Sequence, residues 1–375
     1  RCFMAKKKVI LFAYDGTGLG HLMRLIKIAS GFSKDVEALI VSGHNALSEV
    51  AQKNMNYFHL PNFYDERDKG KTNFEVNSYR MKILWNIIND YKPDAFVTDY
   101  LPLGKRCELY PIIAKYPTKK FFILRSEIGG EILAHQDVFS RRNLMFLDEK
   151  YTKIYVAGDK KIITPETYDW LPSTIKQKME YAGCVTFKVT PNDIRETRQI
   201  YNPYEKKWIV CSVGGGRKGE HYIKKCISIA SDFKYRDYIF DIVLGHYSPL
   251  DANIYIKSHN IPSNIRIHQS IKNLYLLNAS ADIVFCTGAY NSLIESMQGK
   301  KKTIISMSVM DDDIENEQTN NIINLSKFYD IKRVVNLEDL KIMFENALNT
   351  GTIKYDHTLN MNGVSYISND IENQL

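Results

Sequence analysis

The stretch Val9-Ile10-Leu11-Phe12-Ala13-Tyr14-Asp15-Gly16-Thr17-Gly18-Leu19-Gly20-His21 decides the fold, because a strand, a loop and the start of a helix follow one another in it. Its apolar first half is typical of a buried strand, and three alternating glycines then break the strand into a loop. Residues 22–30 continue with the apolar spacing of a helix. This order predicts an α/β protein with a mostly parallel sheet.

The glycine loop suits an anionic or polyhydroxylated ligand. Glycine lets backbone N–H groups approach a ligand closely, and the first turn of a helix adds unpaired N–H groups and the positive end of a dipole. His21, at the far edge of the loop, adds a titratable group where chemistry can occur. The simpler interpretation is a tight strand-to-helix turn followed by a solvated histidine.

The spacing of the glycines does not fit two common phosphate-binding motifs cleanly. In a dinucleotide-binding pattern that begins at Gly16, the sixth position is His21 instead of glycine. A Walker A loop would close with Gly-Lys-Ser or Gly-Lys-Thr, and this loop does not. A NAD-dependent oxidoreductase is disfavoured for the same reason.

Length and composition indicate an ordinary globular protein with two domains. The chain has 375 residues, of which 44% are hydrophobic and 25% charged. No run approaches the ~20 apolar residues of a membrane span. The net charge of +7 is mild and spread out, so it allows an anionic substrate or membrane surface but gives no argument for nucleic acid. The six cysteines form no C-x-x-C pair, which favours buried thiols in a reducing cytoplasm.

Strand-like and helical runs alternate through the first half of the chain. The expected strands are residues 8–14, 37–42, 56–59, 95–98, 120–124 and 153–156. The expected helices are residues 23–32, 45–53, 74–91 and 103–115. Alternation of this kind predicts βαβ units.

The pattern starts again in the second half. Residues 188–207 are turn-rich and polar, which suits a linker between an N-terminal domain (1–187) and a C-terminal domain (208–349). The C-terminal domain is expected to contain Gly214-Gly215-Gly216, a helix at 222–233 and strands at 208–213, 238–244, 265–268, 283–286, 303–306 and 333–335. We therefore expect two Rossmann-like domains facing one another across a cleft, with ligands beyond the carboxyl ends of the strands.

Three motifs of the second half have the chemistry of a nucleotide-diphosphate site. They are the glycines and cations of residues 212–219, the strand-to-helix turn of residues 286–295 and the polar cluster of residues 317–321. Helix N-termini with glycines and hydroxyls bind phosphates, and a carboxylate one turn into a helix can accept hydrogen bonds from both ribose hydroxyls. Taken singly, Glu295 could equally be a surface charge and Gln318 a solvated polar residue.

In their order along the chain, these motifs resemble those of the GT-B glycosyltransferases. Gly-Thr-x-x-Gly-His, Gly-Gly-Gly, Thr-Gly-Ala…Glu and Glu-Gln-x-x-Asn are similar to the branch of the peptidoglycan lipid-linked N-acetylglucosaminyltransferase. Residues 18–24 also match the Gly-x-Gly-His-x-x-Arg motif of predicted glycosyltransferases. The resemblance spans residues 8–330. It implies a metal-independent, inverting transferase that moves a sugar from a nucleotide-diphosphate sugar, UDP-linked in that branch, to a hydroxyl acceptor, with residues 350–375 crossing back to the first domain.

The resemblance also implies a role for each matching residue. In the glycine loop, Gly16, Thr17, Gly18 and Gly20 would face the diphosphate and the acceptor. The donor would be bound by residues of the second half, namely Gly215, Gly216, Arg217, Ile271, Gly288, Ala289, Asn291, Ser292, Glu295, Gln318 and Asn321. Among these, Glu295 would hold the ribose, and Gln318 and Asn321 the sugar. The chain departs from the lipid-linked branch by the extra residue Leu19 and by Arg217 in place of a small polar residue.

Inverting transfer needs a base for the acceptor hydroxyl and positive groups for the leaving diphosphate. We expect His21 to be the base or to position the acceptor, since an imidazole suits either task near pH 7. A carboxylate would orient the ring. Asp99 is the first candidate because it follows a strand, and Glu127 is the second. Either acid could instead be a loop cap or a surface ion pair.

Metal, cofactor and partner expectations follow from the same reasoning. Asp311-Asp312-Asp313 is interpreted as a solvated acidic loop and not as a metal ligand set, because cations and a helix dipole already serve the diphosphate. No cofactor is expected, since the nucleotide sugar is a co-substrate.

Residues 61–91 could dock on the inner face of a membrane, but their pattern is also typical of an amphipathic core helix. The alternatives to a transferase are a non-hydrolysing UDP-sugar 2-epimerase and a non-catalytic nucleotide-sugar-binding protein.

Overall fold

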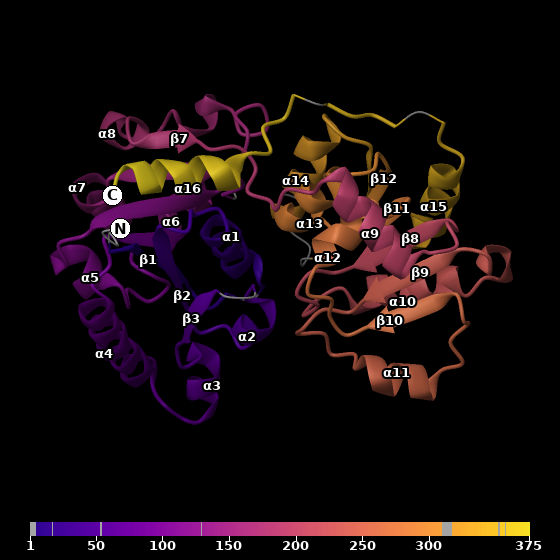
Figure 1. Ribbon diagram of the computed structural model, residues 1–375, viewed down its shortest axis with the longest axis horizontal. Helices are drawn as coiled ribbons and strands as arrows, with labels where there is room; N and C mark the ends of the chain where they lie inside the picture. Colours follow the sequence, from indigo (N-terminus) through magenta and orange to yellow (C-terminus); the bar gives the residue numbers. More distant parts are fainter. Residues whose placement is uncertain are drawn as a thin grey trace. The chain divides into compact units, whose positions relative to one another are not determined.

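The computed structural model describes residues 5–16, 18–52, 55–128, 130–309, 317–351, 353–356 and 358–375. Thr17 of the glycine loop and the acidic run 311–313 lie outside these ranges. The chain divides into two compact units (Figure 1). Unit 1 comprises the residues up to Thr186 together with Leu359–Leu375, and unit 2 comprises Phe187–Thr358.

In the described part of unit 1, seven parallel strands form one sheet in the order β3-β2-β1-β4-β5-β6-β7. The strands are β1 (Lys7–Ala13), β2 (Val36–Ser42), β3 (Asn56–His59), β4 (Ala95–Asp99), β5 (Lys119–Arg125), β6 (Lys153–Ala157) and β7 (Met179–Tyr181). The central strands are almost fully buried. This explains why they read as continuous apolar runs in the sequence.

Helices cover the sheet of unit 1. They are α1 (Gly20–Ala29), α2 (Leu47–Val50), α3 (Phe63–Asp68), α4 (Asn73–Tyr91), α5 (Tyr110–Lys115), α6 (Glu131–Gln136), α7 (Arg141–Lys150), η1 (Pro165–Tyr168), α8 (Ser173–Lys176) and α16 (Gly363–Asn373). Ile10 and Phe12 of β1 share one core cluster with Leu84 and Ile88 of α4 and with Ile112 of α5. These strand residues alternate, so they project from one face of the sheet.

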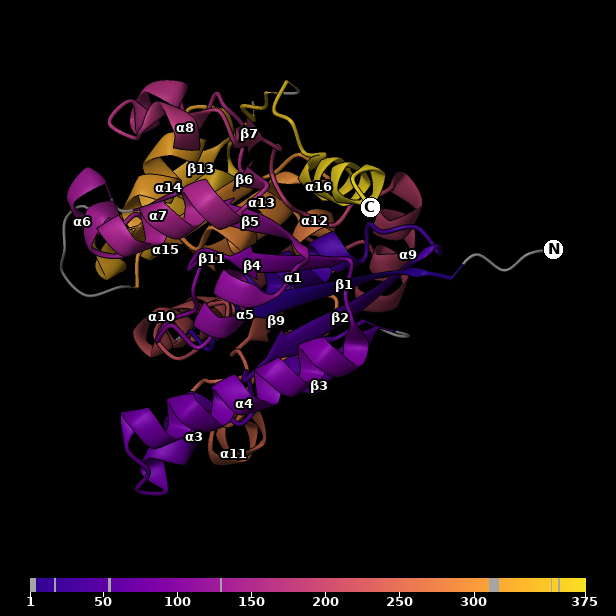
Figure 2. The same cartoon turned by 90° about the vertical axis from the view of Figure 1, so that its left-hand side faces the viewer.

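Helix α4 is the amphipathic core helix that the pattern of residues 61–91 suggests. Its N-cap Thr72 and Glu75 form a reciprocal capping box, which explains where the helix begins. Val76, Arg80, Leu84 and Ile88 are buried at a spacing of four residues. α3 lies beside the N-terminal end of α4 (Figure 2).

The end of the chain belongs to unit 1. Helix α16 packs against α1 (Figure 1). Just beyond the end of α1, a Cβ atom on Gly31 would lie 2.6 Å from Ser368 Oγ, so the chain passes close to α16 there. Lys153 of β6 forms an ion pair with Asp370 at 2.8 Å. Helix α16 therefore packs onto unit 1, in contact with α1 and with the side chain of Lys153 from β6.

Among the residues described in unit 2, six parallel strands follow the order β10-β9-β8-β11-β12-β13. They are β8 (Trp208–Ser212), β9 (Ile239–Val243), β10 (Ile265–His268), β11 (Ile283–Thr287), β12 (Thr303–Met307) and β13 (Ile331–Val334). The helices are α9 (Pro191–Tyr201), α10 (Glu220–Ala230), η2 (Phe233–Tyr235), α11 (Ala252–Ser258), α12 (Leu274–Ser280), α13 (Tyr290–Met297), α14 (Glu317–Ser326), η3 (Leu337–Asp339) and α15 (Leu340–Leu348).

The turn-rich interpretation of residues 188–207 is wrong in part, because α9 occupies most of this stretch. Thr190 caps the helix and forms a capping box with Asp193, and Pro191 takes the first helical position. Thr, Pro and Asp in this order also suit a turn, so the residue types alone do not reveal the start of this helix.

In the part of the chain that is described, no helix is long and apolar enough to span a membrane.

Candidate functional site

Both sheets have a switch point, where the strand order turns from one direction to the other. In unit 1 it lies between β1 and β4, and in unit 2 between β8 and β11. Ligands of open α/β sheets bind outside the carboxyl ends of the strands at such points. The glycine loops of the sequence follow β1 and β8, so the topology brings each loop to a switch point.

At the switch point of unit 1, His21 is held at both ring nitrogens. It lies in the first turn of α1, which begins at Gly20, earlier than the sequence pattern suggests. Nδ1 is 3.3 Å from Oδ1 of Asp99, at the end of β4, and Nε2 is 2.8 Å from the hydroxyl of Tyr14. The His21 side chain is 14% exposed, whereas that of Asp99 is fully buried. The ring is therefore fixed and still open to a ligand on one side.

Arg24 also binds Asp99. Its Nη1 donates to both carboxylate oxygens, at 2.7 and 2.8 Å. His21 and Arg24 are three positions apart, so they share one face of α1 and reach the same carboxylate. This contact gives the Gly-x-Gly-His-x-x-Arg motif a physical meaning. Arg24 was not among the expected site residues, although the motif contained the signal for it.

Two aromatic rings lie close to the His21 ring. The centroid of the His21 ring lies 4.6 Å from that of Tyr14 and 5.5 Å from that of Tyr100. The guanidinium of Arg125 in turn covers Tyr100 at 4.1 Å. Tyr100 has a left-handed backbone, with φ 62°, which a bulky residue adopts only where the surroundings impose it. Burial raises the pKa of Tyr14, so its phenol keeps the proton that it can donate to Nε2.

Asp99, the first carboxylate candidate, is the one found at Nδ1 of His21. Glu127 lies half-buried in the loop after β5. Its charge adds to the burial that raises the pKa of Tyr168. The structure therefore places Glu127 near Tyr168. Asp99 meets His21 because β4 is the neighbour of β1 in the sheet, whereas β5, which precedes Glu127, is one strand further away.

Asp15 anchors the glycine loop. Its carboxylate accepts hydrogen bonds from the backbone of Gly43 (3.0 Å) and Phe63 (2.9 Å) and from Arg80 (2.7 Å). These residues come from the end of β2, the start of α3 and the middle of α4. Gly16 adds a hydrogen bond from its N–H to Nε2 of His44, at 3.3 Å. Gly18 has open space around it, since a Cβ added there would have no atom within 4 Å, while Gly20 starts α1.

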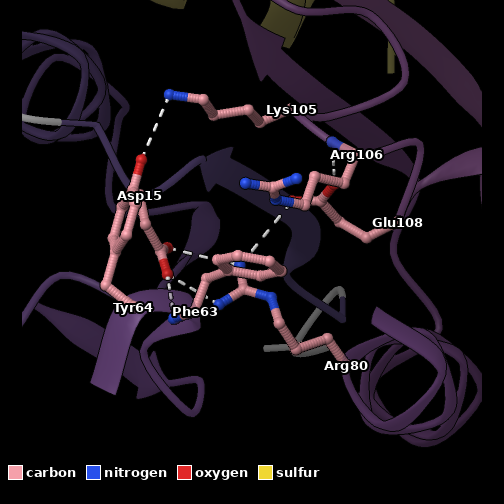
Figure 3. Close-up of a pocket in the computed structure, with 7 residues that line it drawn as sticks. All are labelled: Asp15, Phe63, Tyr64, Arg80, Lys105, Arg106 and Glu108. Carbon is pink, nitrogen blue, oxygen red and sulfur yellow. Dashed lines mark hydrogen bonds and ion pairs between the residues drawn. The ribbon is translucent and has the colours of Figure 1, made fainter. Parts of the chain in front are cut away.

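A small pocket opens beside Asp15. It has about 220 Å³ of empty space, counting the part open to solvent, and is lined by Asp15, Phe63, Tyr64, Arg80, Lys105, Arg106 and Glu108 (Figure 3). Arg80 and Glu108 are buried, with Nη2 and Oε1 3.7 Å apart. Burial raises the pKa of Glu108, although Arg80 opposes this. The sequence reasoning missed this pocket, because it joins four separate segments.

At the switch point of unit 2, two glycine loops interlock. A Cβ on Gly216 would lie 2.2 Å from the carbonyl oxygen of Leu244, so the loop after β8 touches the loop after β9. Tyr247 donates its N–H to the carbonyl of Gly215 at 2.7 Å. Arg217 lies over the Tyr247 ring at 5.3 Å. The loop is thus held in one conformation, with its cation packed along its side.

The loop between β11 and α13 joins the same site. Ala289 is the N-cap of α13, and Asn291 and Ser292 lie in its first turn. A Cβ on Gly214 would lie 3.9 Å from Ser292 Oγ, so the loops after β8 and β11 are neighbours. Glu295 is half-buried one turn further on, where its charge adds to the burial that raises the pKa of Tyr275.

Gln318 and Asn321, the two residues expected to contact the donor sugar, form hydrogen bonds to loops of the protein itself. Asn321 is buried and donates its amide to the carbonyl of Gly288 at 3.1 Å. Gln318 accepts a hydrogen bond from the backbone of Val309 at 2.9 Å. The backbone of Gln318 would also lie 2.4 Å from a Cβ on Gly288. The start of α14 therefore shapes the loop before α13.

Ile271 lies further along the same edge of the sheet. Ile271 follows β10, two strands from β8 in the sheet. Asp311-Asp312-Asp313 lies outside the described residues. Within the described ranges, no cluster of three or more His, Cys, Asp or Glu side chains could hold a metal ion.

Comparison with known proteins supports the fold. No family model and no curated protein matches the chain. Among solved structures, it is similar to the calicheamicin glycosyltransferase CalG4 (TM-score 0.59, 12% identity, 99% of this chain and 95% of that chain). It is also similar to MurG of Acinetobacter baumannii (TM-score 0.55, 11% identity, 98% and 99%). A third is the UDP-GlcNAc 2-epimerase of Neisseria meningitidis, bound to UDP-GlcNAc (TM-score 0.62, 11% identity, 98% and 100%). The prediction of a GT-B fold built from two Rossmann-like domains is confirmed.

Proposed function

We propose that the chain is an inverting, metal-independent glycosyltransferase that moves a sugar from a nucleotide-diphosphate sugar, UDP-linked, to a hydroxyl of an acceptor. The observation that carries the proposal is the pairing of His21 with Asp99 at the switch point of unit 1. A histidine whose Nδ1 faces a carboxylate presents its other nitrogen as a base.

We place the donor on unit 2. The loops after β8 and β11 and the N-terminus of α13 supply backbone N–H groups for the diphosphate. Arg217 and Lys218 add positive charge that would offset the charge developing on the leaving group. Glu295 is proposed to hold the ribose, and Gln318 and Asn321 to shape the loop against which the sugar binds.

The base step follows from the contacts of His21. Asp99 accepts a hydrogen bond from Nδ1–H, which leaves the lone pair of Nε2 available. In the free protein the phenol of Tyr14 donates to Nε2, and we propose that the acceptor hydroxyl takes over this position. As Nε2 removes the hydroxyl proton, the acceptor oxygen bonds to the anomeric carbon and the bond to the diphosphate oxygen breaks. The configuration at that carbon is inverted, and the nucleoside diphosphate leaves.

The direct test starts with the donor. A panel of nucleotide-diphosphate sugars is screened for a rise in Tm, since a bound donor stabilises the folded protein. The sugars that bind are then offered with hydroxyl acceptors, and release of the nucleoside diphosphate and the new glycoside are followed. If no nucleotide sugar or nucleoside diphosphate raises Tm, the proposal is wrong.

A UDP-sugar 2-epimerase is the second candidate, and the structural similarity to the Neisseria meningitidis enzyme supports it. An epimerase needs no acceptor, so incubating UDP-GlcNAc with the protein alone separates the two activities. An epimer formed under these conditions would replace the transferase proposal. Binding without any product would instead point to a nucleotide-sugar-binding protein.

We expect the protein to act in the cytoplasm. The five cysteines that the structure describes are free, and four of them are buried, which suits a reducing compartment. Contact with the inner face of a membrane would use the side of α4 that leaves Phe74 79% and Tyr79 49% exposed. Flotation with anionic liposomes tests this contact, and a protein that stays unbound contradicts it.

A further inference from the structure

We propose that the pocket lined by Tyr64, Lys105 and Arg106 binds an anionic phosphate group carried by the acceptor. The inference rests on the proposed function and deepens it, because it names the chemistry of the acceptor. The pocket lies in unit 1, and Lys105 and Arg106 line one part of it (Figure 3). Both residues belong to the segment between β4 and α5.

Two adjacent cations face this pocket without an acidic partner. Lys105 and Arg106 are both exposed, and in the described ranges neither forms an ion pair with a carboxylate. Nζ of Lys105 donates to the hydroxyl of Tyr64 at 3.3 Å. The guanidinium of Arg106 lies over Phe63, 3.9 Å from the ring centroid (Figure 3). Stacking engages the face of the guanidinium, while its N–H donors lie in its plane and can reach an anion.

The acids in the pocket do not cancel this charge. Asp15 and Glu108 are each only 4% exposed. Asp15 is saturated by Arg80 and by the backbone of Gly43 and Phe63. Glu108 accepts from the backbone of Arg106 at 2.9 Å and lies against Arg80. The open side of the pocket therefore carries the positive charge, and its floor carries the buried acids.

The pocket is next to the proposed base. Nζ of Lys105 lies 5.9 Å from the centroid of the Tyr14 ring, and the hydroxyl of that ring contacts Nε2 of His21. One tyrosine ring thus separates the cation from the base. An acceptor whose hydroxyl and phosphate are about one sugar ring apart could bind both, and the half-open ring of Tyr64 offers a face for its carbon skeleton.

The test measures binding of simple phosphates to the full chain. Glycerol 3-phosphate and glycerol are titrated into the wild type, the double variant Lys105→Gln/Arg106→Gln and the control Lys115→Gln, which removes an exposed lysine at the end of α5. We expect glycerol 3-phosphate, and not glycerol, to bind the wild type and the control. Loss of two charge-assisted contacts should weaken this binding about tenfold or more in the double variant. Both removed side chains are exposed, and a rise in Tm with UDP checks that the variant is folded.

Vesicles identify where the phosphate comes from. The same proteins are mixed with phosphatidylcholine vesicles with and without phosphatidic acid, a phosphate monoester on a lipid. Binding to glycerol 3-phosphate indicates a free phosphorylated acceptor, whereas binding only to phosphatidic acid indicates a lipid-borne acceptor. Either result supports the site if the double variant loses that binding. Equal binding by wild type and double variant, or no binding to either probe, overturns the inference. Failure of every nucleotide sugar and nucleoside diphosphate to bind would instead overturn the proposed function, so the two failures are distinguishable.

Discussion

Nδ1 of His21 and Oδ1 of Asp99 lie 3.3 Å apart, although the two residues are 78 positions apart in the chain. They meet because β1 and β4 are neighbours in a parallel sheet, so the loops after both strands emerge at the same edge. Arg24 binds the same carboxylate and balances its charge. The carboxylate is therefore tied to two side chains of one helix.

Replacing His21 by alanine should abolish most of the transfer activity. If Nε2 accepts the hydroxyl proton, its loss should lower kcat by about 100-fold or more. The proposed donor site lies on the other unit, so the rise in Tm with UDP should be unchanged. A variant whose kcat stays within a few-fold of the wild type would show that His21 is not the base.

Asp99→Asn should impair both stability and turnover. The amide no longer balances the buried guanidinium of Arg24, and breaking such a pair costs about 3–5 kcal/mol of the free energy of unfolding. Arg24→Met should destabilise the protein as well, because it leaves the Asp99 carboxylate without its counter-charge. The double variant should lose less than the sum of the two single losses in urea denaturation. Additive losses would contradict a direct ion pair.

Gly288→Ala should disrupt the proposed donor loop. The new Cβ would lie 2.4 Å from the carbonyl oxygen of Gln318, so the loop before α13 or the start of α14 must shift. We expect the rise in Tm with UDP to disappear and the free energy of unfolding to fall by about 1–3 kcal/mol. Gly351→Ala, in the same unit, places its Cβ where no atom lies within 4 Å and serves as the control. If both variants respond to UDP alike, the loop does not bind the diphosphate.

Transfer should continue in excess EDTA. The proposed donor site relies on Arg217, Lys218 and the N-terminus of α13 instead of a metal ion. The assay compares product formation by metal-free protein with and without added Mg²⁺. Activity that appears only with Mg²⁺ would assign a metal role to the site and direct attention to Asp311-Asp312-Asp313.

Much of the fold could be predicted from the sequence, because buried parallel strands are continuous apolar runs that end in glycine loops. The proximity of Asp99 to His21 followed from the same rule, since both residues come after strands that end at one edge. The prediction was wrong where the same residue types occur both in turns and at the start of helices. Thr190, Pro191 and Asp193 start a helix here, yet the same residue types also form turns.

Other parts of the site could not be predicted, because they depend on contacts between distant segments. Asp15 and Arg80 are 65 positions apart and meet only because α4 packs beside the end of β1.

Two local features could not be predicted either. The three-residue strand β7 is too short to show a pattern. The contact of Tyr14 with His21 is local, seven positions apart, but no periodicity predicts which ring nitrogen a tyrosine will reach.

Lys302 should make the stability of the protein depend on pH. It is fully buried, and its ammonium donates to the carbonyls of Ala279, Ser296 and Gln298 at 2.9–3.1 Å. Burial lowers the pKa of Lys302 from 10.5 to about 7. Between these two values the unfolded chain binds one more proton than the folded chain, so the free energy of unfolding rises with pH.

The comparison with Lys302→Met isolates this effect. Methionine cannot titrate and removes the ammonium donor from the three carbonyls, so the variant should be less stable throughout. From pH 7 to pH 9 the wild type should gain about 2–3 kcal/mol relative to the variant, by the linkage of one proton. Below pH 7 the lysine keeps its proton in both the folded and the unfolded state, and the difference between wild type and variant should level off. Urea denaturation at pH 6, 7, 8 and 9 measures it. A difference that stays constant over this range would show that the three carbonyl oxygens keep Lys302 protonated despite its burial.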